Sequence, residues 1–142
     1  MKRLMALLLA ILVTVVANGT VLAAGSALKA SPSSVKFGTK PVGSITLKGT
    51  RLTNRSEATI NVLVTAGLPD DFAFGLFPGS TCPVFDPEPL APGESCVAVV
   101  QFRPTEFFAG EQQTATLIAI ASDPASGTEV ATLFIDFTGT GR

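Results

Sequence analysis

Histidine, tryptophan and tyrosine are absent from this chain of 142 residues. Without an imidazole, neither a Ser-His-Asp site nor a Cys-His site can form. Histidine-based zinc and copper sites are excluded for the same reason. Methionine occurs only at Met1 and Met5, so a methionine-rich copper carrier is excluded as well. The composition thus removes the commonest hydrolytic and transition-metal chemistries.

Two pairs of acids, Asp70/Asp71 and Asp86/Glu88, are the remaining catalytic candidates. A glycosidase holds two carboxyl groups rigidly, roughly 5–10 Å apart. Such sites usually carry aromatic platforms for sugars, and this chain has no tryptophan or tyrosine. The same acids could ligate calcium, but they lack the alternating acidic spacing of a calcium loop. We therefore expect no enzymatic activity, no metal and no cofactor, with the acids solvated in a loop.

The first 24 residues have the three-part pattern of a secretory signal peptide. Lys2 and Arg3 precede an apolar run over 4–16, and small residues at 21–25 follow as a cleavage site after Ala23 or Ala24. The alternative is a membrane anchor, but a spanning helix needs about 20 apolar residues. We expect residues 25–142 to form one periplasmic or secreted domain that leaves the membrane after cleavage.

Charge is unevenly distributed along the chain. Without Lys2 and Arg3, eight cations face eleven acids, and a net charge of −3 predicts neither nucleic-acid binding nor membrane attraction. Residues 25–55 hold six cations and no acid, whereas residues 56–142 hold two cations and all eleven acids. Either neighbouring strands interleave and balance these charges, or the molecule has one basic edge.

From about Val35 onward the chain alternates apolar and polar residues between turn signals, which predicts short strands. We expect an all-β, immunoglobulin-like, antiparallel sandwich of two sheets and about seven strands. The expected strands cover 35–37, 44–54, 59–65, 72–75, 96–103, 114–121 and 130–138. In the second strand, Ile45 and Leu47 would point to one face of the sheet and Leu52 to the other. This change of face along the strand predicts a bulge near Gly49. The expected core comprises Phe37, Ile60, Val62, Val100, Phe102, Leu117, Leu133, Ile135 and Phe137.

Residues 67–93 differ from the rest because they hold six of the ten prolines, which remove ladder donors. Within this connection, residues 68–89 are a candidate partner-binding loop, since long loops on a rigid scaffold often carry function. Its aromatic candidates are Phe72, Phe74, Phe77 and Phe85. The alternative is that these rings cap the open end of the core.

The strongest local motif runs from Leu90 to Cys96, in which Pro92-Gly93 fits the centre of a type II turn. Further motifs are Phe37 to Gly43, Leu52-Thr53-Asn54 and Phe137 to Gly141. Together they resemble the choice-of-anchor D domain of the abnormal-spindle and hydin (ASH) type, whose fold is similar to that of major sperm protein. The resemblance covers about residues 31–141. It implies a seven-stranded immunoglobulin-like sandwich without a shared catalytic site.

Cys82 and Cys96 are the only cysteines, and an even pair in an exported protein predicts a disulfide. The resemblance implies a pair at the same place. A redox or metal pair is the alternative, although redox motifs favour C-x-x-C and two thiolates make a poor zinc site. A bridge here would close a loop of about 15 residues, which would stabilise the folded state by roughly 3 kcal/mol.

These observations favour an exported, non-catalytic module that binds or scaffolds a protein partner. The alternative is a structural subunit of a cell-surface assembly, joined by β-strand addition at a sheet edge. A pilus chaperone fits less well, because those proteins usually have two such domains. The residues leave the partner's identity and the oligomeric state open.

Overall fold

The structure is a computed structural model that describes residues 26–67 and 73–142. The expected signal peptide, residues 1–24, lies outside the described residues. Nine strands and one short 3-10 helix, η1, make up this part of the chain. Their bounds are β1 Leu28–Ser31, β2 Ser34–Lys40, β3 Thr46–Asn54, β4 Ile60–Gly67, β5 Phe74–Leu76, β6 Glu88–Leu90, β7 Ser95–Phe102, η1 Glu106–Phe108, β8 Gln112–Ser122 and β9 Glu129–Gly141.

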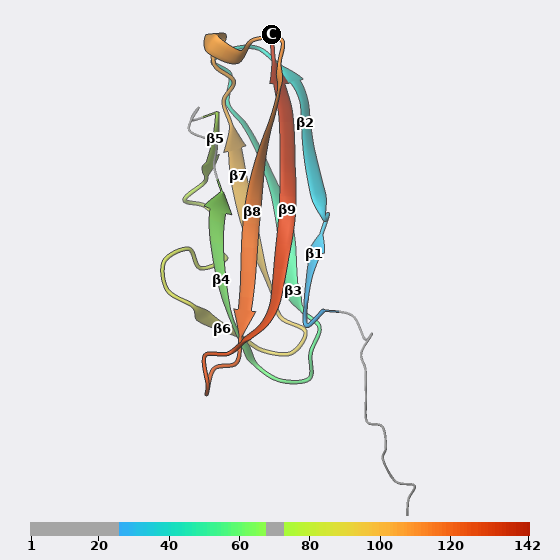
Figure 1. Cartoon of the computed structure of the whole chain (residues 1–142), viewed down its shortest axis with the longest axis vertical. Helices are drawn as coiled ribbons and strands as arrows, with labels where there is room; N and C mark the ends of the chain where they lie inside the picture. The colour runs from blue at the N-terminus through green and yellow to red at the C-terminus, as the bar shows by residue number, and fades with distance from the viewer. Residues whose placement is uncertain (1–25, 68–72) are drawn as a thin grey trace, which may run out of the picture.

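The strands form two sheets that pack face to face as a sandwich (Figure 1). One sheet has the order β1-β3-β7-β5 and the other the order β2-β9-β8-β4-β6. The predicted all-β sandwich is confirmed. The strand pairs are antiparallel, except that β2 runs parallel to β9, so the second sheet is mixed.

The first predicted strand, 35–37, lies within β2. The stretch from β1 to β2 contributes one strand to each sheet. β1 pairs with β3 in one sheet, and β2 pairs with β9 in the other. Pro32 stands between them and has no N–H to donate, so the ladder is interrupted where the chain changes sheets. Because β1 and the three-residue β6 were not predicted, the count is nine strands rather than seven.

The core contains the inward-facing residues of both sheets, as strand alternation requires. Eight of the nine predicted core residues are buried, and Leu133 is partly buried. Phe37, Phe74 and Phe102 form an aromatic cluster, in which the ring centroid of Phe102 lies 5.2 Å from that of Phe37 and 4.8 Å from that of Phe74. Gly139 of β9 faces this cluster, where a Cβ would stand 2.6 Å from the Phe102 ring. The glycine thus allows the ring to lie directly on β9.

The predicted bulge at Gly49 is absent. The β3–β7 register runs without a break from Thr46 opposite Phe102 to Thr53 opposite Ser95. Register shifts occur instead between Lys36 and Gly38 in β2–β9 and at the end of β8. The change of phase in β3 has another cause: Leu47 is an exposed residue on the outer face, whereas Leu52 faces the core.

Two turns show how side chains and glycine set the loop geometry. Gly93 has φ +78°, and the Glu94 N–H donates to the Ala91 carbonyl at 3.0 Å, as the Pro92-Gly93 motif predicts. In the β8–β9 turn, the Asp123 carboxylate accepts hydrogen bonds from the backbone N–H groups of Ser126 and Ala125. These bonds favour the charged form and lower the pKa of Asp123.

Candidate partner-binding surfaces

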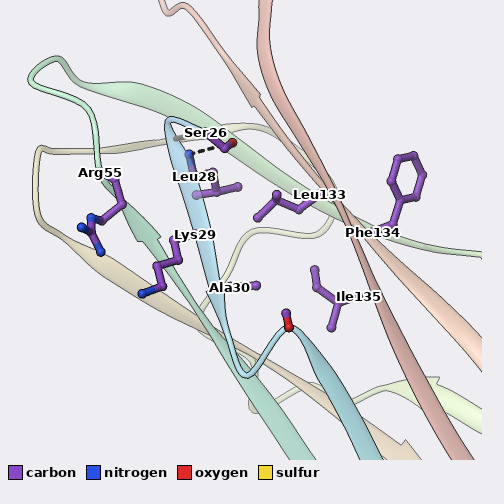
Figure 2. Close-up of a pocket in the computed structure, with 9 residues that line it drawn as sticks. Ser26, Leu28, Lys29, Ala30, Arg55, Leu133, Phe134 and Ile135 are labelled. Carbon is purple, nitrogen blue, oxygen red and sulfur yellow. Dashed lines mark hydrogen bonds between the residues drawn. The ribbon is translucent and has the colours of Figure 1, made fainter. Parts of the chain in front are cut away.

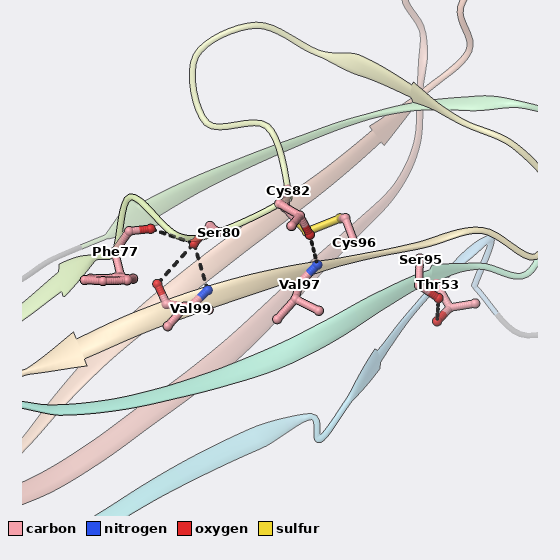
Figure 3. The surroundings of a disulfide bond; sticks show 9 residues. Thr53, Phe77, Ser80, Cys82, Ser95, Cys96, Val97 and Val99 are labelled. Carbon is pink, nitrogen blue, oxygen red and sulfur yellow. Dashed lines mark hydrogen bonds between the residues drawn. A yellow bond between two sulfur atoms is a disulfide. The ribbon is translucent and has the colours of Figure 1, made fainter.

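The predicted disulfide joins Cys82 to Cys96, with an S–S distance of 1.99 Å (Figure 3). It holds the segment after β5 against the edge of β7. The Ser80 hydroxyl accepts from the Val99 N–H at 2.8 Å, and the Thr81 hydroxyl accepts from the Val97 N–H at 2.8 Å. Part of this edge of β7 is therefore covered by a loop and not by a strand.

The four candidate phenylalanines of the predicted loop have different environments. Phe74 begins β5 and is buried, with its ring against Phe37 and Phe102. This ring belongs to the core, as the core-cap alternative expects for it. Phe77 is half-buried, Phe85 is 92% exposed, and Phe72 lies outside the described residues. Among the candidate rings that lie within the described residues, Phe85 is therefore the most exposed.

Phe85 belongs to an exposed acidic segment, residues 85–89, which we call the Phe85 segment. All five residues, Phe-Asp-Pro-Glu-Pro, are exposed. The last two residues of the segment, Glu88 and Pro89, belong to β6, which pairs with β4 at one edge of the five-stranded sheet. Pro83 lies just before the segment, and its carbonyl accepts a hydrogen bond from the Val64 N–H at 2.8 Å. This bond ties the base of the segment to β4. The segment therefore projects an aromatic ring flanked by acids from a fixed base.

A second surface lies on the opposite flank, between β1 and β9. It is a cleft of about 500 Å³, which we call the β1–β9 cleft. In Figure 2, Leu28 and Leu133 point toward each other across it, while the Phe134 ring points away. Leu28 and Ile135 are buried, so the floor of the cleft is apolar. The lining residues are Ser26, Leu28, Lys29, Ala30, Ser33, Arg55, Leu133, Phe134 and Ile135.

The cleft exists because the chain changes sheets before β2. β2 pairs with β9 only from Asp136 to Gly141. Over Glu129–Ile135, β8 is the strand paired with β9 in the described part of the chain, and β1 lies opposite in the other sheet. The edges of β1 and β9 therefore border the cleft, and no strand of the described part of the chain lies between them.

Two of the six cations of residues 25–55 lie at this cleft, Lys29 on β1 and Arg55 just after β3. Lys29 and Arg55 are exposed and stand at the rim of the cleft (Figure 2). The Arg55 N–H donates to the Ala27 carbonyl at 2.7 Å, which keeps both cations at one end of β1. Within residues 26–67 and 73–142, no acid forms an ion pair with either cation. Lys29 and Arg55 therefore form a small basic patch at the rim of the cleft.

Of the two acid pairs, Asp70/Asp71 lies outside the described residues, and Asp86/Glu88 lies in the Phe85 segment. Among the described residues, no group of three or more acids and cysteines is arranged to hold a metal ion. The same part of the chain contains no helix that is long and apolar enough to cross a membrane.

Comparison with known proteins places the fold in a recognised group. No protein-family model matches the chain, and no curated protein sequence matches it. The structure is similar to PapD-like domain 7 of human CEP192, an ASH / PapD-like domain, with 12% identity over 92% of this chain and 95% of that one, at a TM-score of 0.67. The chain has an ASH-type fold. The choice-of-anchor D assignment itself stays a prediction from the sequence motifs.

Two further structures extend the group to which this ASH-type fold belongs. WR4, a major sperm protein family member from C. elegans, is 9% identical over 82% of this chain and all of that one, at a TM-score of 0.56. The YadV chaperone is 10% identical over 81% of this chain, at a TM-score of 0.59. This chain covers 52% of the chaperone, so the likeness extends over about half of that protein. At these identities the likeness establishes the fold alone.

The sequence pattern named the loop that contains the Phe85 segment as a candidate, but it did not predict the β1–β9 cleft. The cleft depends on β1 joining one sheet and β2 the other, which local periodicity does not reveal. The sequence did contain one clue, the run of six cations without an acid in residues 25–55. Two of those cations, Lys29 and Arg55, form the rim of the cleft.

Proposed function

We propose that this chain is an exported, non-catalytic module that binds a protein partner through the β1–β9 cleft. The observation that carries the proposal is an apolar floor, formed by Leu28, Leu133 and Ile135, beside two exposed cations that have no acidic partner among the described residues. An apolar concavity with a few fixed polar groups is the usual form of a binding site.

One observation supports an extracytoplasmic location, and a second supports a role in protein binding. The Cys82–Cys96 disulfide fits an oxidising compartment such as the periplasm or the exterior. The similarity to the YadV chaperone, an ASH-like relative in fold, agrees with a role in protein binding. With the sequence pattern of residues 1–24, these observations are consistent with a signal peptide that is removed on export.

Site-specific photo-crosslinking in the native envelope tests the proposal. A benzophenone side chain replaces Ser33, which is exposed and lines the cleft. The matched control carries the same group at Phe107, which is 87% exposed and lies in η1, outside the cleft. We expect protein crosslinks from position 33 and few from position 107. Equal crosslinking at both positions, or none at position 33, would contradict a binding role for the cleft.

A structural subunit joined by β-strand addition is the second candidate. It is favoured by the edge of β9 over Glu129–Ile135, which has no paired strand on its cleft side in the described part of the chain. An added strand would take its main-chain hydrogen bonds there. Hydrogen exchange on the partner-bound protein separates the two candidates. Strand addition should protect alternate amides of 129–135, whereas side-chain docking should leave those amides unchanged.

A further inference from the structure

The two candidate surfaces of this chain have opposite and matching chemistry. The β1–β9 cleft has an apolar floor with Lys29 and Arg55 at its rim. The Phe85 segment presents an exposed ring with Asp86 and Glu88 beside it. We propose that the occupant of the cleft is the Phe85 segment of a second copy of this chain. This inference rests on the proposed function, because it names the partner of that same cleft.

The apolar part of the contact is a ring entering a cleft. Phe85 is 92% exposed, which leaves a large apolar side chain in water. Burying a phenylalanine removes roughly 150–250 Å² from water and favours association. The cleft of about 500 Å³ has room for this ring and the backbone that carries it. The ring would rest on the apolar floor of the cleft, which Leu28 and Leu133 help to form.

The polar part of the contact pairs opposite charges. Asp86 and Glu88 follow the ring on the chain, while Lys29 and Arg55 stand at one end of the cleft. None of these four side chains forms an ion pair within the described residues, so all are available to a second copy. Charge complementarity of this kind fixes orientation and disfavours wrong partners.

The Phe85 segment has little freedom to lose on binding. Pro87 and Pro89 restrict its backbone. The Cys82–Cys96 bridge and the hydrogen bond from the Val64 N–H to the Pro83 carbonyl anchor its base. A segment that is ordered before binding gives up less conformational entropy, and this raises affinity.

The positions of the two surfaces set the mode of association. β6, which includes Glu88 and Pro89 of the Phe85 segment, is one edge strand of its sheet, whereas β2 is the other edge strand and lies beside β9. Figure 1 shows β6 and β1 on opposite sides of the molecule, both nearer the β8–β9 turn than the C-terminus. One contact between two copies therefore leaves one cleft and one Phe85 segment free. Association continues head to tail, because such a heterologous contact does not close in a pair.

Charge exchange between the two surfaces tests the inference by sedimentation velocity. Wild-type protein should form a concentration-dependent series of oligomers that weakens as salt is added, since salt screens exposed charges. The cleft variant Lys29→Glu/Arg55→Glu and the segment variant Asp86→Lys/Glu88→Lys should each be monomeric. In each variant, the cleft and the segment carry the same sign of charge. An equimolar mixture should regain the oligomers, because each variant then meets a surface of opposite sign.

Matched controls change the same net charge at the other end of the molecule. Arg103→Glu/Arg142→Glu is the control for the cleft variant, and Glu106→Lys/Glu111→Lys for the segment variant; all four residues are exposed. Both controls should associate like wild type. Phe85→Ala should weaken association at least tenfold without a change in melting temperature.

The inference is overturned if wild-type protein is monomeric up to about 1 mM, the range of very weak binding. It is overturned equally if the mixture of the two charge variants stays monomeric while each variant is folded by circular dichroism. The mass of the crosslink from position 33 separates this failure from that of the proposed function. A product of twice the chain mass supports self-association, and a product with a different protein supports the binding role but overturns the second copy as occupant.

Discussion

At the scale of single residues, Phe102 is one of the rings of the aromatic core. It is fully buried and contacts the rings of Phe37 and Phe74. Phe102→Ala should lower the free energy of unfolding by roughly 3–5 kcal/mol, because a cavity would remain between the sheets. Urea denaturation measures the change, with Phe107→Ala as the exposed control, expected within about 0.5 kcal/mol of wild type. A loss below about 1 kcal/mol for Phe102→Ala would mean that the site collapses around the missing ring.

Asn54 is a buried polar residue that ties three segments together. Its amide nitrogen donates to the carbonyls of Ala58 and Leu90, both at 2.8 Å, and its amide oxygen accepts from the Ser56 N–H. The side chain is fully buried, so its amide is closed off from solvent in the folded protein.

Asn54→Ala should therefore cost at least about 2 kcal/mol of unfolding free energy, since buried carbonyls and an N–H would lose their partners. The control is Asn61→Ala on β4, where the side chain is only half-buried. Denaturation curves measure the difference, and the unfolding free energies of the two variants are compared where both depend on denaturant concentration with the same slope. Equal stability of the two variants would contradict the role of Asn54 as a connecting residue.

At the scale of elements, the disulfide fixes the connection between β5 and β7. Cys82 and Cys96 are 14 residues apart and their Cα atoms lie 4.9 Å from each other. Cys96→Ser should reduce stability by roughly 2–4 kcal/mol, because the unfolded chain regains the freedom of a closed loop. In unreduced native protein, thiol alkylation should label neither cysteine.

The double variant Cys82→Ser/Cys96→Ser serves as the control for this experiment. Its stability should be insensitive to reductant, whereas reduced wild-type protein should fall to a similar stability. Ready labelling of both thiols in the exported, unreduced protein would refute the bridge.

The strands could be predicted from the sequence wherever one face is buried over several residues. In β8, Ala115, Leu117 and Ala119 are buried in the predicted phase. β1 and β6 have four and three residues, too few to show a period of two. The exposed Leu47 misled the prediction for β3, because hydrophobicity on an outer face looks like a change of phase.

At the scale of the whole molecule, the N-terminal pattern predicts export with cleavage. We expect the exported protein to begin at Ala24 or Gly25, because the apolar run and the small residues at 21–25 match a signal peptidase site. Intact-mass analysis of protein recovered from the periplasm or medium measures this directly. A variant with Ala23→Tyr should be cleaved poorly, since the site needs a small residue. A mature mass that includes residues 1–23 would contradict the prediction.

The sequence by itself determined the class of fold, the pattern of the core, the cysteine pair and the absence of histidine chemistry. These follow from composition and from the alternation of side chains along a strand, which are local properties. It also identified residues 67–93 as the irregular segment, although four neighbouring phenylalanines gave no means of telling the buried Phe74 from the exposed Phe85.

Only the tertiary structure decided which strands stand next to each other. The passage of the chain from one sheet to the other between β1 and β2 opens the β1–β9 cleft, and pairing between strands far apart in sequence brings Lys29 and Arg55 to its rim. The same pairing places the acidic Phe85 segment at the opposite edge of the five-stranded sheet. Such arrangements depend on long-range contacts between whole strands, so a pattern read residue by residue cannot contain them.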